Sequence, residues 1–150
     1  MWVGQSRASS VSWARSPWQT STPTRIWTGP VASWWPGAQY VTWVGIDGYY
    51  YRGSDTFASV FGTTIDQVRA FTGKPVLLSE TAVAPTADQF AMIQDLFRGM
   101  AAYKTLGLVW FDKTQHGGID HQNWRIEGNT AAEAALRLGV SALTLTRPSG

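Results

Sequence analysis

Cysteine is absent from this chain of 150 residues. Its absence excludes thiol catalysis, iron–sulfur clusters and zinc sites built on cysteine ligands. A chain of this length still buries roughly 70% of the surface that its unfolded form exposes, so it can form a core without disulfides or a structural metal. We therefore expect one domain, or one piece of a larger domain, rather than two full-sized domains.

Charge and long apolar runs are also scarce. Only 15% of the residues are charged, and 12 lysine and arginine residues against 10 acidic ones give a net charge of +2. So small and scattered an excess does not make a basic surface, and we expect no nucleic-acid partner. No run approaches the roughly 20 apolar residues of a membrane span, and the first residues lack the pattern of a signal peptide. We expect neither a membrane partner nor a signal peptide in this chain.

Tryptophan is the residue type in excess. The chain has nine, and seven of them lie at or before residue 43. A large ring-binding surface or an aberrant N-terminus would each explain this bias. Residues 1–39 are rich in Ser, Thr, Pro and Gly and are expected to be mostly loop, with one short strand near 9–14. We expect residues 1–25 to be poorly ordered or aberrant.

From residue 40 onward, strands and helices are expected to alternate. Apolar runs predict buried strands at 40–47, 75–80 and 107–112. Residues 56–71 have apolar residues at helical spacing, and we expect Gly62 to split them into two short helices and Gly73 to end the second. Another helix is expected between Thr86, as its cap, and Gly107, with one apolar face. The last helix is expected at 130–138.

The details of these helices are also predicted. The apolar face of the helix between Thr86 and Gly107 is formed by Phe90, Ile93, Phe97 and Met100. Asn129 is expected to cap the last helix. Alternation of apolar strands with helices indicates an α/β fold with a parallel sheet, either doubly wound or a barrel. No glycine-rich phosphate-binding motif follows any strand, which disfavours a nucleotide-binding domain.

Three expected strands end in side chains that can do chemistry. They are Asp47 with Tyr49, then Glu80, then Trp110 with Asp112. The carboxyl ends of parallel strands meet at one edge of the sheet, so we expect these side chains to converge there. A buried carboxylate such as Glu80 must be hydrogen-bonded, protonated or used. The alternatives are a helix cap or ion pair for Glu80 and core packing for the aromatic residues.

Four segments together resemble the C-terminal half of a family 26 glycoside hydrolase. They read WPGAQYVTWVGIDGY at 35–49, KPVLLSE at 74–80, LVWF at 108–111 and NWRI at 123–126. The family comprises retaining β-glycanases, chiefly β-mannanases, that fold as (β/α)8 barrels. The resemblance covers about residues 26–139 and implies strands 5 to 8 of such a barrel, that is, the C-terminal half of a TIM-type fold. Residues 140–150 would then be a C-terminal tail.

The resemblance also implies roles for individual residues. Glu80 would be the catalytic nucleophile, Tyr49 would orient it, and Trp110 would be the platform beneath the sugar. A phenol that donates to a carboxylate favours its ionised form, as a nucleophile requires. Further candidates for contact with the sugar are Asp47, Asp112, His116, Gln122 and Trp124, with Trp34 and Trp35 as extensions of the aromatic floor. Core packing is the alternative for each of these three tryptophans.

One part of the catalytic machinery has no counterpart in the sequence. A retaining glycosidase needs a general acid, and in this family it is a glutamate on strand 4 that usually follows histidine; no His-Glu or Asn-Glu pair occurs here. Glu127 and Glu133 follow the last strand and are expected on solvated surfaces. Asp112 is the only acid expected at the same sheet edge that could substitute. We therefore expect a fragment of a retaining β-glycanase that does not hydrolyse β-mannan by itself.

Several expectations follow for ligands and partners. The substrate would be a polysaccharide, most simply β-1,4-mannan, and the family implies an extracellular location. No cofactor is expected. A metal site at His116 and His121 with Asp112 or Asp120 is a weaker alternative that we do not favour. The open edges of half a barrel would favour self-association. The alternative functions are a non-catalytic carbohydrate-binding domain and a purely structural α/β domain.

Overall fold

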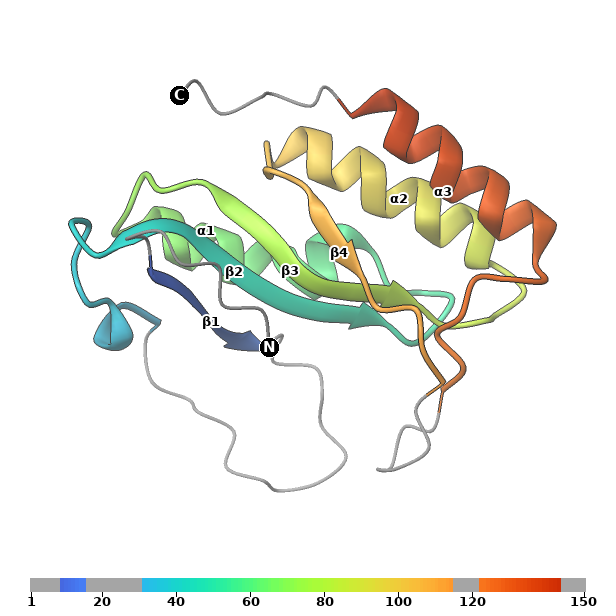
Figure 1. Cartoon of the computed structure of the whole chain (residues 1–150), viewed down its shortest axis with the longest axis horizontal. Helices are drawn as coiled ribbons and strands as arrows, with labels where there is room; N and C mark the ends of the chain where they lie inside the picture. Colours follow the sequence, from blue (N-terminus) through green and yellow to red (C-terminus); the bar gives the residue numbers. More distant parts are fainter. Residues whose placement is uncertain (1–8, 16–30, 115–121, 144–150) are drawn as a thin grey trace.

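A parallel β-sheet organises the chain. The computed structural model describes residues 9–15, 31–114 and 122–143, and it contains the strands β1 (Ser9–Arg15), β2 (Val41–Tyr50), β3 (Val76–Val83) and β4 (Leu108–Trp110) (Figure 1). They lie in the order β1-β2-β3-β4, and each pairs in parallel with its neighbour. The predicted parallel strands are confirmed, but their ends differ: β2 and β3 continue past the predicted ends at 47 and 80, so Asp47 and Glu80 lie within the strands, and β4 ends before 112. β1 lies within the segment expected to be poorly ordered, and the rest of residues 1–25 lies outside the described residues.

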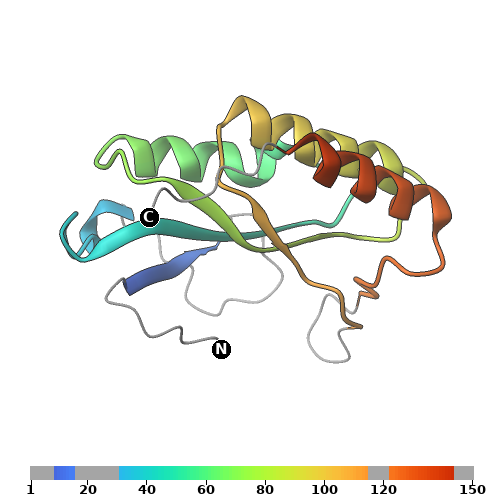
Figure 2. The same cartoon turned by 45° about the horizontal axis from the view of Figure 1, so that its top comes forward.

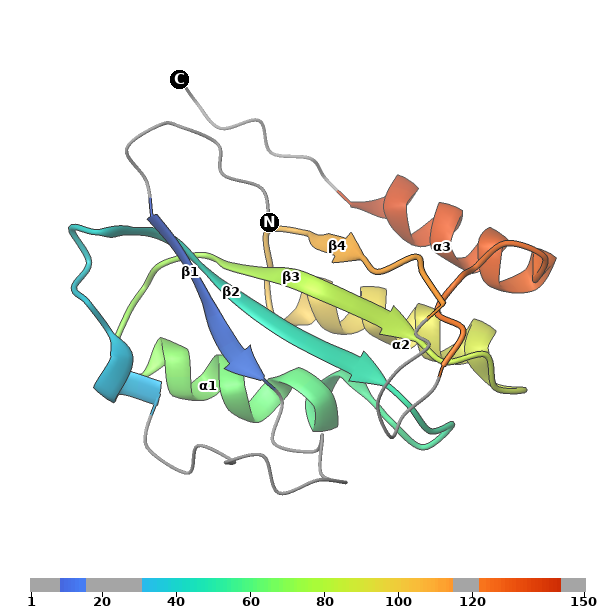
Figure 3. The ribbon, with the colours of Figure 1, turned by 60° about the horizontal axis from the view of Figure 1, so that its bottom comes forward.

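The helices lie on one face of this sheet. They are the 3-10 helix η1 (Val31–Trp34), the π-helix η2 (Ala58–Gly62), α1 (Thr63–Arg69), α2 (Gln89–Ala102) and α3 (Thr130–Ala142). Figure 2 shows α1, α2 and α3 on the same side, and Figure 3 shows the opposite face of the strands. A doubly wound sheet reverses its strand order and has helices on both faces. Within the described residues the strands follow chain order and α1, α2 and α3 lie on one side, so this part of the chain contains no such reversal.

The main hydrophobic core fills the space between the sheet and these helices. Strand residues Ile46, Tyr50, Leu78 and Val83 are fully buried in it. Helical spacing brings Phe61, Ile65 and Val68 from the η2–α1 segment and Ile93, Leu96 and Met100 from α2 onto the same side. Each such side chain contributes roughly 1.5–3 kcal/mol when it leaves water. This burial fixes which face of β2 and β3 is turned toward the helices.

The first helical segment consists of two short helices that meet at Gly62, as predicted, but the glycine does not interrupt it. The π-helix η2 continues directly into α1, and Gly62 keeps right-handed helical dihedral angles, with φ −53° and ψ −56°. A Cβ atom at this position would lie 2.9 Å from Tyr103 Oη, so the glycine permits a close approach instead of breaking the helix. The prediction that Gly73 ends the segment was wrong, because α1 ends at Arg69.

The limits of α2 also differ from the prediction. Asp88, not Thr86, is the residue before the helix, and α2 ends at Ala102 rather than at Gly107. The carbonyl of Gly107 accepts a hydrogen bond from Leu78 N over 3.1 Å, so this glycine already belongs to the sheet. Phe90 is 39% exposed and does not belong to the buried face. Helix propensity and the spacing of apolar residues did not predict the turn around residue 86.

The cap of α3 is confirmed. Asn129 Oδ1 accepts from Ala132 N over 3.1 Å, as an N-cap side chain does. Its Nδ2 group donates to Gln89 Oε1 over 2.8 Å, and Gln89 Nε2 in turn donates to Val83 O over 3.0 Å. This chain of contacts joins the start of α3 to the start of α2 and to the end of β3. Helix α3 continues to Ala142, beyond the predicted end.

Candidate active site

The carboxyl-terminal halves of β2 and β3 bring together the two residues with the strongest sequence signal. Tyr49 Oη donates a hydrogen bond to Glu80 Oε1. Both side chains are half-buried. Asp47 is the register partner of Glu80 across the two strands, so its position confirms the predicted convergence of these three residues at one sheet edge. The roles implied for them stay predictions.

The phenol of Tyr49 stays protonated in this setting. Burial, and then the hydrogen bond to the Glu80 carboxylate, raise the pKa of Tyr49 well above the ordinary value for tyrosine. Both causes act in the same direction, because a phenolate beside a carboxylate would be a second negative charge in a partly dry site. Tyr49 is therefore a hydrogen-bond donor, and not a base, throughout the neutral pH range.

A cluster of aromatic rings supports Tyr49 from the face of the sheet opposite the helices. Its ring lies 4.8 Å from that of Trp124 and contacts Phe111 edge-on at 6.0 Å between centroids. Tyr51 packs edge-on against Trp124 at 5.1 Å, and Ala82 and Ala84 complete a small second core. Such ring pairs contribute about 0.5–1.5 kcal/mol beyond area burial. The cluster holds the Tyr49 ring in one orientation.

Trp124 is a core residue in this arrangement. Only 1% of its surface is exposed, because it packs with Tyr49, Tyr51, Ala82 and Ala84. The interpretation of Trp124 as a surface for sugar contact was therefore wrong. Trp34 and Trp35 do not belong to the site either: they precede β2 at the opposite, amino end of the sheet, and the ring of Trp35 packs against Phe71 at 5.4 Å.

Trp110 lies at the end of β4, in register with Thr81 of β3. Its side chain is half-buried and packs against both the main core and the aromatic cluster. Its Nε1 atom and Thr81 Oγ1 are buried, and neither has a hydrogen-bond partner among the described residues. Its platform role stays a prediction.

The two aspartates at this edge differ in their partners. Asp47 Oδ1 accepts from Ser79 Oγ over 2.6 Å. Asp112 is exposed, and its Oδ1 atom accepts from Ile126 N over 3.0 Å, which ties the segment after β4 to the segment before α3. The structure thus shows a loop contact for Asp112, and its expected contact with a sugar stays a prediction.

The remaining predicted contacts lie partly outside the described residues. His116, His121 and Asp120 are not among them, so their proposed contacts with a sugar or a metal stay untested. Gln122 is half-buried. Within the described ranges no group of three or more potential metal ligands occurs, and no helix is long and apolar enough to span a membrane.

The described glutamates other than Glu80 have surface partners. Glu127 forms a 3.0 Å ion pair with Arg125, and both side chains are about half exposed. Glu133 accepts from Arg137 over 2.9 Å and from Gly128 N over 3.1 Å at the start of α3. These partners are all at the surface, in agreement with the expected place of both glutamates.

Sequence reasoning missed three residues of this region: Ser79, Tyr51 and Phe111. Ser79 sits directly before Glu80, and Tyr51 and Phe111 directly follow Tyr50 and Trp110. For Ser79 and Phe111 the available signal was their position next to Glu80 and Trp110, and it was weak because neighbouring residues on a regular strand point to opposite faces. For Tyr51 the signal was better, because it lies two residues after Tyr49 and alternation places both on one face.

Comparison with known proteins adds little to this geometry. No protein-family model matches the chain, and no curated protein matches it. Among solved structures, the chain is similar to the crystal structure of the endo-beta-1,4-glucanase Xac0029 from Xanthomonas axonopodis pv. citri, with 13% identity and a TM-score of 0.44. The similarity covers 65% of this chain and 37% of that chain. So low a score and identity assign neither a family nor an activity.

Proposed function

We propose that residues 26–139 form the C-terminal half of a (β/α)8 glycoside hydrolase catalytic domain, in which Glu80 is the nucleophile of a retaining β-glycanase. The hydrogen bond from Tyr49 to Glu80 carries this proposal. A neutral phenol that donates to a carboxylate at the carboxyl edge of a parallel sheet stabilises the ionised form that attacks carbon. The singly wound sheet and the resemblance to family 26 support the same reading, with β-1,4-mannan as the proposed substrate.

The reaction proceeds in two displacements. An ionised Glu80 oxygen attacks the anomeric carbon, a glycosyl ester forms, and the bond to the leaving oxygen breaks with its electron pair. A general acid gives that oxygen a proton and then, as a base, takes one from the water that hydrolyses the ester. Tyr49 keeps its own proton throughout and orients the Glu80 carboxylate.

No described carboxylate is assigned the part of the general acid. Asp47 Oδ1 is occupied as an acceptor for Ser79, and Asp112 Oδ1 is occupied by Ile126 N. General acid–base assistance contributes about 10²- to 10⁴-fold to such reactions. We therefore propose that the 150-residue chain hydrolyses mannan poorly by itself, whereas a substrate whose leaving group needs no proton still reacts with Glu80.

The test uses such a substrate, 2-deoxy-2-fluoro-β-mannosyl fluoride. Attack by Glu80 forms the ester bond and releases fluoride, so the intact protein gains the mass of one fluorosugar, and peptide mapping locates it. We expect the adduct on Glu80, none in Glu80→Gln, and a slower reaction in Tyr49→Phe. A folded parent chain that gives no adduct on Glu80 contradicts the proposal. The gluco isomer, run in parallel, tests the choice of mannan.

The same experiment separates this proposal from the two alternatives. A non-catalytic carbohydrate-binding domain would be retarded in a gel that contains mannan, yet would form no adduct. A structural domain would do neither. Retention without labelling would therefore favour the binding function, for which the partly buried aromatic residues Tyr51, Trp110 and Phe111 are the candidates for stacking on a sugar.

A further inference from the structure

The pairing of β2 with β3 contains one residue too many on β3. Ile46 pairs with Leu78, and Tyr50 pairs with Val83. All four side chains are fully buried in the core beneath the helices, so all four point to the same face of the sheet. Tyr50 is four positions after Ile46, whereas Val83 is five positions after Leu78. Side chains alternate along a regular strand, so an odd interval between two residues on one face requires a β-bulge in β3.

The register locates the bulge at Ser79. It passes from the pair Ile46 and Leu78 directly to the pair Asp47 and Glu80, so Ser79 is the extra residue of β3. This irregularity changes the direction of Glu80. On a regular strand, residue 80 would point the same way as Leu78, into the core beneath the helices. With the extra residue, Glu80 points to the face that carries Tyr49, with which it forms its hydrogen bond.

The extra residue has a partner in the neighbouring strand. Ser79 Oγ donates to Asp47 Oδ1 over 2.6 Å, and Asp47 is the register partner of Glu80 itself. The contact thus bridges the two strands at the level of the bulge. A hydroxyl bond to a carboxylate is short and roughly twice as strong as a neutral one. It restrains the backbone at the residue that directly precedes Glu80.

We propose that Ser79 and Asp47 are positioning residues: their hydrogen bond fixes the bulge that aims the Glu80 carboxylate at Tyr49 and at the open face of the sheet. The chemical purpose of this arrangement rests on the function proposed above for Glu80. Neither residue takes part in bond making. They act through the direction and rigidity of the Glu80 side chain, and a misplacement of about 1 Å at a reacting group can cost about 10²-fold in rate.

Two measurements on the full chain test this role. The first is the rate of Glu80 labelling by the fluorosugar. The second is the ¹³C resonance of the Glu80 carboxyl group and its change on Tyr49→Phe, which reports the contact without any reaction. We expect Ser79→Ala and Asp47→Ala to label Glu80 at least ~10-fold more slowly and to lose most of the response to Tyr49→Phe. Ser79→Thr and Asp47→Asn keep a donor and an acceptor and should stay near the parent in both.

Ser141→Ala is the matched control, because it removes a serine hydrogen bond of 2.8 Å, to Arg137 O, at the far end of α3. It should change neither readout. If Ser79→Ala is too unstable to study, Asp47→Ala breaks the same contact from the other strand. Parent-like labelling together with a parent-like Tyr49 response in Ser79→Ala and Asp47→Ala would overturn the proposal. If the parent itself forms no adduct, the function proposed for Glu80 fails, but the resonance still decides whether Ser79 and Asp47 position it.

Discussion

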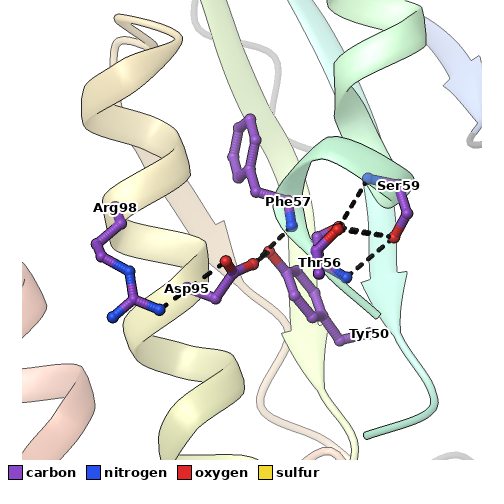
Figure 4. Close-up of polar contacts among 6 residues, drawn as sticks. All are labelled: Tyr50, Thr56, Phe57, Ser59, Asp95 and Arg98. Carbon is purple, nitrogen blue, oxygen red and sulfur yellow. Dashed lines mark hydrogen bonds and ion pairs between the residues drawn. The ribbon is translucent and has the colours of Figure 1, made fainter. Parts of the chain in front are cut away.

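Tyr50 donates its phenol hydrogen to Asp95 Oδ2 over 3.1 Å, and so joins the end of β2 to the middle of α2. The same oxygen accepts from Phe57 N over 2.6 Å, at the start of the π-helix, while Arg98 lies 4.0 Å from the other carboxylate oxygen (Figure 4). One half-buried carboxylate therefore connects a strand and two helical segments. It satisfies a backbone N–H that has no partner within its own helix.

Asp95→Ala should lower the free energy of unfolding by about 2–3 kcal/mol, because two hydrogen bonds to a charged group are lost and a buried phenol is left without its acceptor. Urea unfolding followed by tryptophan fluorescence measures this change. Arg98→Ala is the control: its guanidinium is mostly exposed and at the limit of an ion pair, so we expect a loss under about 1 kcal/mol. Equal losses in the two variants would mean that the ion pair, not the Tyr50 and Phe57 contacts, stabilises this junction.

Alkaline pH should destabilise the fold. Burial, followed by the charge of Asp95, raises the pKa of Tyr50 far above its ordinary value, and burial with Glu80 does the same for Tyr49. Above about pH 10 the unfolded chain releases these phenol protons while the folded chain keeps them. The unfolded state then binds fewer protons, so the stabilisation that is complete below about pH 10 falls by about 1.4 kcal/mol per pH unit for each such tyrosine.

Urea midpoints measured from about pH 8 to about pH 11 check this expectation. Tyr50→Phe should be less stable than the parent near neutral pH, because Asp95 loses a donor, but should lose less further stability as the pH rises. Parallel pH profiles for the parent and Tyr50→Phe would show that Tyr50 does not titrate differently in the folded and unfolded chains.

Trp124→Ala should destabilise the fold by about 3–5 kcal/mol, as expected for the removal of a large buried ring that supports Tyr49 and Tyr51. Thermal or urea unfolding measures the loss. Leu138→Ala, at an exposed position of α3, should change stability by no more than about 0.5 kcal/mol. A stable Trp124→Ala chain that had only lost affinity for oligosaccharide would restore the ligand-contact interpretation of Trp124.

Gly99→Ala should also destabilise the fold, although alanine usually stabilises a helix relative to glycine by roughly 0.5–1 kcal/mol. A Cβ atom at Gly99 of α2 would overlap the side chain of Phe57, so overpacking of about 1–3 kcal/mol should prevail. Gly73→Ala is the comparison, because nothing lies within 4 Å of its added methyl group. A Gly99→Ala chain more stable than the parent would contradict the close packing of α2 on the η2 segment.

The sequence by itself determined the order of strands and helices, because continuous apolar runs and helical spacing reflect burial that local periodicity records. It also predicted that polar side chains late in neighbouring parallel strands lie near one edge of the sheet, whereas the contact of Tyr49 with Glu80 was implied only by the family resemblance. The cap at Asn129 was equally local, requiring only a side-chain oxygen within reach of Ala132 N. These features depend on a few neighbouring residues or on a general property of parallel sheets.

Only the tertiary structure decided which face each residue occupies. The run from Val76 to Val83 has no alternation of polar and apolar residues, so nothing in it marks Ser79 as an extra residue, and counting in twos from Leu78 sends Glu80 to the wrong side. Trp124 was equally undecided, because an indole ring suits a sugar surface and a core alike. Its burial depends on Tyr49 and Tyr51, which are distant in sequence and approach it only when β2 pairs with β3. Strand pairing, which depends on contacts between distant segments, made both decisions.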